Sequence, residues 1–207
     1  LPIISEESTP ISFQERRLWP RYWLIDPLDG TKEFLKKNDE FTINIALIDQ
    51  HKPILGVIFA PALDVCYLAE DTKGAFKQIA QNRPQPLHSR AWEEGSTITA
   101  AVSRRHGMNA LKIFLAQFEH LNLLHCGSAL KFCFLAEGLA DIYPRFSPTF
   151  EWDTAAGQCI LEQAGGAIID YKGKPLRYNM SSSLQKIAFL AVADKSHCWL
   201  NYLKASI

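Results

Sequence analysis

Four alternating runs of apolar and polar residues, placed in succession between residues 41 and 79, constrain the fold of this chain most strongly. FTINIALIDQHKPILGVIFAP alternates on both sides of residues 49–52, which is the pattern of a β-hairpin. VCYLAEDTKGAFK continues with two shorter strands around residues 71–74. Strands that follow one another with polar breaks predict an antiparallel sheet that is covered on one face.

The pattern changes beyond residues 81–97, a polar stretch that contains proline. Upstream of the hairpin we expect a strand end at Ile3 and Ile4, a loop over 9–21 and a short strand over 22–25. Downstream, strands and helices alternate. We expect strands at 98–103, 140–143, 167–170 and 188–192, and helices at 109–117, 128–137, 154–163 and 196–204.

This division predicts two subdomains. The first, residues 1–95, is an N-terminal α+β unit with the antiparallel sheet and most of the metal ligands proposed below. The second, residues 96–207, is a C-terminal α/β unit with the nucleotide-binding side and the last metal ligand.

Composition excludes several classes of protein. The chain has 207 residues, 47% of them hydrophobic, and 22 basic residues balance 22 acidic ones. Overall charge therefore gives no reason to expect a nucleic acid as partner. The five cysteines are widely spaced without a Cys-x-x-Cys pair, which argues against a zinc site or a disulfide framework. No apolar run approaches the ~18 residues of a membrane span, and no signal peptide is recognisable, so we expect a cytoplasmic protein.

Two aspartates interrupt the chain at the edge of its predicted core, in WLIDPLDGTKEF. A capped turn would explain Asp-Pro and Asp-Gly taken alone. However, Asp26 ends an apolar strand, where an unpaired carboxylate is costly, and Pro27 bends the chain so that Asp26 and Asp29 can converge. Converging carboxylates repel unless a cation neutralises them. Together with the Leu28 carbonyl, they are the oxygen ligands that suit Mg²⁺.

Other residues extend this metal site. Gly30 and Thr31 begin a helical stretch, whose free N–H groups can bind phosphate. Glu6 follows a strand end in ISEES, and Asp153 lies at the start of a helix in EWDTAAG. Singly, Glu6 reads as a surface charge and Asp153 as a helix cap. Together with the two central aspartates, they favour metal-assisted phosphoryl transfer.

The segments ISEES, WLIDPLDGTKEF and EWDTAAG, in this order, resemble the inositol monophosphatase superfamily of Mg²⁺-dependent, lithium-sensitive phosphomonoesterases, over essentially the whole chain. GTKEF, SRRH at 103–106, GSALKF at 127–132 and YPRF at 143–146 are most similar to its 3'(2'),5'-bisphosphate nucleotidases, the CysQ type. The resemblance implies an α+β fold, the layered αβαβα sandwich of the inositol monophosphatase and fructose-1,6-bisphosphatase type.

The implied reaction is hydrolysis of 3'-phosphoadenosine 5'-phosphate to AMP and phosphate, and also attack on 3'-phosphoadenylyl sulfate, in sulfate assimilation. The closest alternative is an inositol monophosphatase or a sugar-bisphosphate phosphatase of the same superfamily. The alternative from another class is a non-catalytic metal-binding fragment, which four carboxylates at an apolar edge disfavour.

The resemblance also assigns roles to residues. Glu6, Asp26 and the Leu28 carbonyl would hold one Mg²⁺, and Asp26, Asp29 and Asp153 a second, in a set of two or three ions. Thr31, Asp29 and Glu6 would be the catalytic residues, with Thr31 orienting the attacking water. The implied substrate-binding set is Glu6, Leu28, Asp29, Gly30, Thr31, His106, Ser128, Lys131, Arg145 and Asp153.

The nucleotide-binding assignments have simpler alternatives. Lys131 could be a solvated helix residue, Arg145 a surface charge, His106 a loop or capping residue and Ser128 the N-cap of its helix. The superfamily also carries an upstream portion, with an aspartate that pairs with the threonine at the Thr31 position. Since the chain begins at LPIISEES, we expect it to be N-terminally incomplete. A homodimer and peripheral association with the cytoplasmic face of the inner membrane are further expectations.

Overall fold

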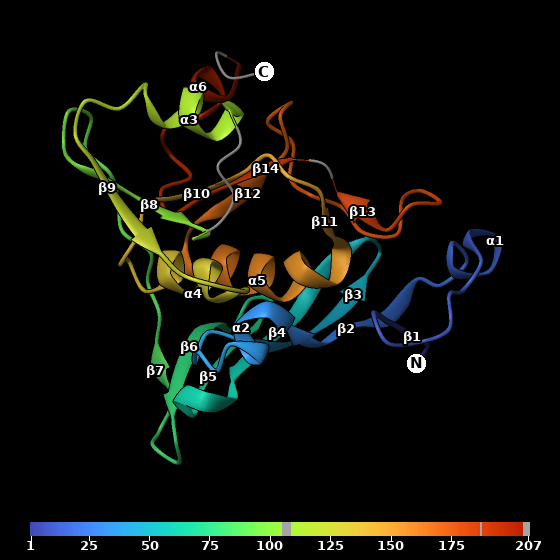
Figure 1. Cartoon of the computed structure of the whole chain (residues 1–207). Coiled ribbons are helices and arrows are strands. Elements are labelled where there is room, and N and C mark those ends of the chain that lie inside the picture. The colour runs from blue at the N-terminus through green and yellow to red at the C-terminus, as the bar shows by residue number, and fades with distance from the viewer. Residues whose placement is uncertain (105–108, 187, 205–207) are drawn as a thin grey trace.

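Two sheets and two layers of helices are stacked in alternation (Figure 1). A seven-stranded sheet lies at the bottom of this view, and helices α4 (Leu130–Ala136) and α5 (Glu151–Ala164) lie on it. A five-stranded sheet follows, and α3 (Asn109–Leu115) and α6 (Leu200–Lys204) lie beyond it. The computed structural model describes residues 1–104, 109–186 and 188–204.

The seven-stranded sheet follows the order of the sequence from β1 to β7. The predicted hairpin is confirmed, because β3 and β4 pair antiparallel and Asp49 lies opposite Lys52. The strands from β2 to β7 pair antiparallel with their neighbours, whereas β1 runs parallel to β2. The strands are β1 (Ile3–Ser5), β2 (Arg21–Asp29), β3 (Thr42–Asp49), β4 (Lys52–Ala60), β5 (Val65–Glu70), β6 (Gly74–Ile79) and β7 (Gln85–Pro86), with a 3₁₀ turn η1 (Pro61–Leu63) and the short helix α2 (Thr31–Leu35) between them.

Helix α5 covers the inner face of this sheet, and glycines set how closely it packs. A Cβ atom at Gly56 of β4 would lie 2.6 Å from the backbone oxygen of Ala156. A Cβ atom at Gly157 would lie 2.3 Å from the ring of Phe132 on α4. The small residues of the DTAAG segment therefore allow the sheet and both helices to approach one another around one core.

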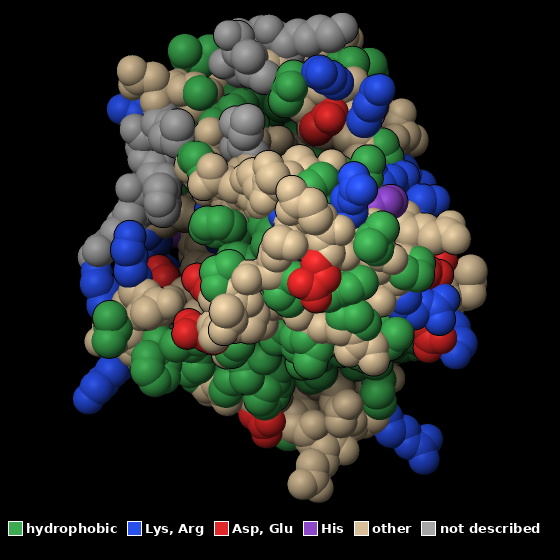
Figure 2. Space-filling view, turned by 90° about the vertical axis from the view of Figure 1, so that its right-hand side faces the viewer, with side chains coloured by type: hydrophobic (Ala, Val, Ile, Leu, Met, Phe, Trp, Pro, Cys, Tyr) green, Lys and Arg blue, Asp and Glu red, His purple; other side chains and the backbone are tan. Residues whose placement is uncertain are grey.

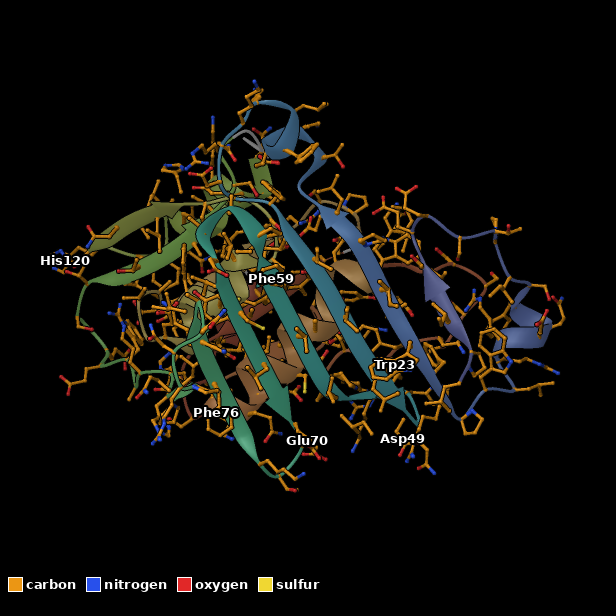
Figure 3. The ribbon with its side chains drawn as sticks, turned by 90° about the horizontal axis from the view of Figure 1, so that it is seen from below. Trp23, Asp49, Phe59, Glu70, Phe76 and His120 are labelled. Carbon is orange, nitrogen blue, oxygen red and sulfur yellow. The ribbon has the colours of Figure 1, made fainter. Side chains whose placement is uncertain are left out.

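The outer face of the same sheet is apolar and half-buried, as the alternating burial of β3, β4 and β5 shows. Trp23 and Phe59 lie on this face, which Figure 3 shows from below. Figure 2 shows hydrophobic side chains gathered over the lower part of the molecule, where the sheet lies. Within the described residues, no helical layer covers this face.

The five-stranded sheet has the order β12-β14-β10-β8-β9, in which β8 runs parallel to both β9 and β10 while β14 is antiparallel to both of its neighbours. A second cluster of buried residues joins it to α3 and α6 through Phe114, Trp199 and Leu203. Its strands are β8 (Ile98–Val102), β9 (Leu121–His125), β10 (Ile142–Arg145), β12 (Ala167–Ile169) and β14 (Phe189–Val192), and a separate pair is formed by β11 (Thr149–Phe150) and β13 (Gln185–Lys186).

Several boundaries differ from the sequence predictions. A short helix, α1 (Phe13–Arg16), lies in the predicted loop over 9–21, because Ser12 accepts a hydrogen bond from the Glu15 N–H and caps it. Strand β9 was not predicted, since its residues lie at a sheet edge, are mostly half-exposed or exposed and do not alternate. β2 continues beyond Ile25 to Asp29.

The helices of the second half also shift. α5 begins at Glu151 rather than residue 154, and α4 begins at Leu130 rather than residue 128, whereas α3 and α6 are shorter than predicted. The division into subdomains 1–95 and 96–207 stays a prediction. The two halves of the chain share one core, because α5 from the second half packs on the first sheet. In the described part of the chain, no helix is long and apolar enough to cross a membrane.

Candidate active site

A bulge in β2 places the two central aspartates. Asp26 pairs with Asn44 and Asp29 with Thr42, so three steps on β2 match two on β3. Pro27 falls inside the bulge, where a missing N–H costs no ladder hydrogen bond. The chain then turns at Gly30, with φ +89°, into α2. The sharp turn after the strand thus presents both carboxylates at the end of the sheet.

The Asp26 carboxylate is buried among like charges. Only 1% of the residue is exposed, and its Oδ1 accepts the Leu28 N–H at 3.0 Å. Burial, followed by the nearby charges of Asp29, Glu6 and Asp153, raises the pKa of Asp26 to about 8. A carboxylate in this position is stabilised by a cation, so the donor set fits a bound metal ion.

Glu6 and Leu28 lie on the two sides of Asp26. The Glu6 N–H donates to the Ile25 carbonyl at 3.3 Å, which continues the pairing of β1 with β2, and the residue is exposed. The Leu28 carbonyl accepts the Thr31 hydroxyl at 3.5 Å. Both predicted ligands are therefore adjacent to Asp26, and Thr31 is tied to one of them.

Asp29 is held from the other half of the chain. Its Oδ2 accepts the Ser128 hydroxyl at 2.6 Å and the Asn44 amide at 3.4 Å. Ser128 has φ +55° and lies two positions before the first residue of α4, whose N-cap is Ala129, so its interpretation as the helix N-cap is wrong. Its hydroxyl points to Asp29 and Thr42 instead.

Asp153 is not the N-cap of α5, since that position is Phe150. It is the third residue of the helix, and its Oδ2 accepts the Phe150 N–H at 3.1 Å, which is the reciprocal contact of a capping box. Burial and the charge of Asp29 raise the pKa of Asp153, against the hydrogen bond from Thr149. Asp153 therefore belongs to the same cluster of carboxylates as Asp29, and its role as a metal ligand stays a prediction.

Two cations lie beside the carboxylates. Lys131 is 2% exposed, donates to the Ser128 carbonyl at 2.7 Å and lies 5.0 Å over the Tyr143 ring. Arg145 donates to the Tyr143 hydroxyl and to the Pro148 carbonyl, both at 3.1 Å. The alternatives of a solvated lysine and a plain surface arginine are wrong, because Lys131 is buried, Arg145 is half-buried and both line a cavity.

That cavity has a volume of about 500 Å³. Six predicted site residues line it: Asp29, Gly30, Ser128, Lys131, Arg145 and Asp153. The sequence interpretation missed other lining residues, among them Lys32, Glu33, Lys36, Asn38, Ser103 and Arg104. The basic run KEFLKK directly after Thr31 was the available signal for some of them.

Other predicted residues lie outside the cavity wall. Glu6, Asp26, Leu28 and Thr31 do not line it, and Thr31 is exposed. Among residues 1–104, 109–186 and 188–204, no three His, Cys, Asp or Glu side chains converge tightly enough to hold an ion as they stand. His106 lies outside the described residues.

The chain is similar to proteins of known kind over most of its length. The model of the inositol monophosphatase family matches residues 1–195. The 3'(2'),5'-bisphosphate nucleotidase CysQ of Escherichia coli strain K12 is 45% identical over 195 residues, which cover 91% of this chain and 74% of that protein. Its counterpart in Haemophilus influenzae is 37% identical and covers 96% of this chain and 74% of that one.

Solved structures show the same likeness. The crystal structure of CysQ from Bacteroides thetaiotaomicron, a bacterial member of the inositol monophosphatase family, matches with a TM-score of 0.84 and 36% identity, covering 94% of this chain and 77% of that chain. The inositol monophosphatase from Anabaena matches with a TM-score of 0.78 and 25% identity, covering 98% and 77%. The layered α/β architecture predicted from the motifs is confirmed, and this chain belongs to the inositol monophosphatase family.

Proposed function

We propose that this protein is a phosphomonoesterase that hydrolyses 3'-phosphoadenosine 5'-phosphate to AMP and phosphate. One observation carries the proposal: carboxylates and cations line one cavity together. Asp29 and Asp153 contribute the carboxylates, and Lys131 and Arg145 the cations. A substrate with two phosphates can place one near the carboxylates, through metal ions, and the other against the cations. The CysQ relatives carry the name of this activity.

The metal is proposed to be Mg²⁺, in two or three ions. Glu6, Asp26 and the Leu28 carbonyl would hold one ion, and Asp26, Asp29 and Asp153 another. Mg²⁺ bound there would lower the pKa of a water molecule and neutralise charge on the departing ester oxygen. The raised pKa of Asp26, caused by burial and by the charge of Asp29, supports this assignment, because a bound cation would stabilise the ionised form of this carboxyl group.

The protein's own groups would position the substrate. Gly30 and Thr31 are proposed to contact the phosphate that is cleaved, and the Thr31 hydroxyl to orient the water. Ser128, His106, Lys131 and Arg145 are proposed to hold the nucleotide. Arg145 has a buried Nε without a hydrogen-bond partner in the described residues, which supports a role in binding an anion.

The test is phosphate release by the full-length protein with Mg²⁺ and four substrates. These are 3'-phosphoadenosine 5'-phosphate, 3'-phosphoadenylyl sulfate, inositol 1-phosphate and fructose 1,6-bisphosphate. We expect the highest kcat/KM with the two nucleotides. A preference for inositol phosphate or the sugar bisphosphate would establish the alternative function, and no release from any of them would favour a non-catalytic protein.

Three further expectations belong to the same proposal. The reaction would serve sulfate assimilation in the cytoplasm. The protein would associate peripherally with the inner membrane, and it would act as a homodimer. Membrane fractionation of the native protein tests the membrane association, and sedimentation analysis tests the dimer.

A further inference from the structure

One carboxylate outside the predicted site joins three segments at the cavity. Glu40, in the loop before β3, accepts the Gly127 N–H at 2.7 Å and forms a two-pronged ion pair with Arg104. Arg104 follows β8 and also donates to the His125 carbonyl at 3.4 Å. Burial opposes ionisation of Glu40, but the hydrogen bonds from Arg104 and Gly127 hold its pKa below the ordinary value.

The turn that Glu40 holds is strained and tightly packed. A Cβ atom at Gly127 would lie 2.8 Å from Cγ of Glu33 and 3.0 Å from the backbone oxygen of Glu40, so only glycine fits. The next residue, Ser128, has φ +55°, a left-handed conformation that costs energy for a residue with a side chain. Such a conformation persists only where its surroundings enforce it.

The same turn connects directly to the proposed active site. The Ser128 hydroxyl donates to Oδ2 of Asp29 at 2.6 Å, and its carbonyl accepts the Lys131 ammonium at 2.7 Å. Shifting Gly127 would therefore disturb the contacts of Ser128 with both Asp29 and Lys131. Glu40 reaches Asp29 through only two intervening residues.

We propose that Glu40 is a positioning residue, which fixes the turn of Gly127 and Ser128 so that Ser128 orients Asp29 and Lys131. Arg104 holds Glu40 in place, and its guanidinium is engaged by that carboxylate rather than by substrate. This inference rests on the proposed function, because Asp29 and Lys131 are assigned there. The length of the Glu40 side chain, which lets its carboxylate accept the Gly127 N–H, matters more for this role than its negative charge.

A second ion pair provides a matched control. Arg21 and Asp49 pair at 2.8 Å with side chains 48% and 30% exposed, close to the 47% and 22% of Arg104 and Glu40. Asp49 ends β3 at the far end from Thr42, and its carboxylate contacts none of the site residues described above. Removing it tests the loss of a similar surface ion pair without disturbing the turn.

The experiment compares substitutions that separate reach from charge. Glu40→Gln keeps an oxygen that can accept the Gly127 N–H, whereas Glu40→Asp keeps the charge but is one methylene shorter. Arg104→Gln and Asp49→Asn complete the set. For each full-length variant, kcat and KM are measured with 3'-phosphoadenosine 5'-phosphate and with adenosine 3'-monophosphate. Amide hydrogen exchange of residues 126–129 is followed in parallel.

We expect Glu40→Asp to lower kcat roughly 10- to 100-fold on both substrates, the loss typical of groups misplaced by about 1 Å, with little change in KM. Its Gly127 amide should exchange faster. Glu40→Gln should retain most of the activity and the protection, and Asp49→Asn should match the wild type. Arg104→Gln should lose less than Glu40→Asp on both substrates.

Three results would overturn the proposal: wild-type kcat in Glu40→Asp, equal losses in Glu40→Asp and Glu40→Gln, or an Arg104→Gln variant whose KM rises for the bisphosphate alone. The last would place Arg104 on the second phosphate. A wild type that hydrolyses neither nucleotide would instead refute the proposed function, and hydrogen exchange would then decide the role of Glu40 alone.

Discussion

The hydroxyl oxygen of Ser128 lies 2.6 Å from Oδ2 of Asp29, although the two residues are 99 positions apart in the chain. This contact joins the bulged end of β2 to the turn before α4. Ser128 also links Asp29 to Lys131, because the Ser128 carbonyl accepts a hydrogen bond from the lysine ammonium. The geometry of the site therefore depends on both halves of the chain.

The first prediction concerns this contact. Ser128→Ala removes a hydrogen bond to a charged group, which contributes about 1.5–3 kcal/mol. We expect kcat/KM for 3'-phosphoadenosine 5'-phosphate to fall roughly 10- to 150-fold, since each 1.4 kcal/mol is a factor of about ten. Steady-state kinetics of the wild type and the variant measures this change in kcat/KM. Ser96→Ala is the control, since Ser96 is exposed and its hydroxyl, within the described residues, donates only to the Glu93 carbonyl. Unchanged kcat/KM in Ser128→Ala would contradict this role.

The second prediction concerns Lys131 and the second phosphate. Lys131→Met keeps most of the buried side-chain volume but removes the charge. A charge-assisted contact of about 1.5–3 kcal/mol implies a loss of roughly 10- to 150-fold with the bisphosphate and a much smaller loss with adenosine 3'-monophosphate. Steady-state kinetics of the wild type and the variant with each substrate gives the two losses in kcat/KM. Equal losses would show that Lys131 acts only in packing and in holding Ser128.

The third prediction follows from the raised pKa of Asp26, which burial and the charge of Asp29 bring to about 8. The unfolded value is about 3.9, so the folded protein without metal keeps a proton that the unfolded chain loses between these pH values. The contribution of Asp26 to stability without metal is therefore greatest at low pH and is lost as the pH rises from about 4 to about 8.

Asp26→Asn removes this titration and keeps an oxygen for the Leu28 N–H. In EDTA at pH 8, the variant should melt at a higher temperature than the wild type, and the difference should shrink toward pH 5. Mg²⁺ should raise the Tm of the wild type more than that of the variant. Asp49→Asn is the control, because Arg21 holds the pKa of Asp49 below its ordinary value. Equal Tm values at pH 8 in EDTA would contradict the predicted pKa of Asp26.

Local patterns predicted the elements that repeat a clear period. Alternation identified β3 to β6, and the Asp-Pro-Leu-Asp-Gly segment identified a turn at which carboxylates gather. A common local role was a poor guide where a tertiary contact decides the conformation. Serine is a preferred N-cap, so the N-cap was the simpler alternative considered for Ser128, whereas the residue contacts Asp29 at positive φ, outside the helix.

Contacts between distant segments were beyond the reach of the sequence. Glu40 and Arg104 are 64 positions apart, and the SRRH segment that contains Arg104 did not indicate Glu40 as its partner. Only the packing of β8 beside the loop before β3 brings them together. Lys131 shows the same limit, since its position on a helix did not indicate that the ammonium is buried against Tyr143.

On the proposed function, buried carboxylates and a metal ion together cleave the 3'-phosphate. The decisive measurement is phosphate release from 3'-phosphoadenosine 5'-phosphate by the full-length wild type, with Mg²⁺ and then with excess EDTA, with Asp26→Asn measured alongside. We expect release by the wild type with Mg²⁺ only, and none by the variant under either condition. Full release in EDTA, or by Asp26→Asn, would contradict it.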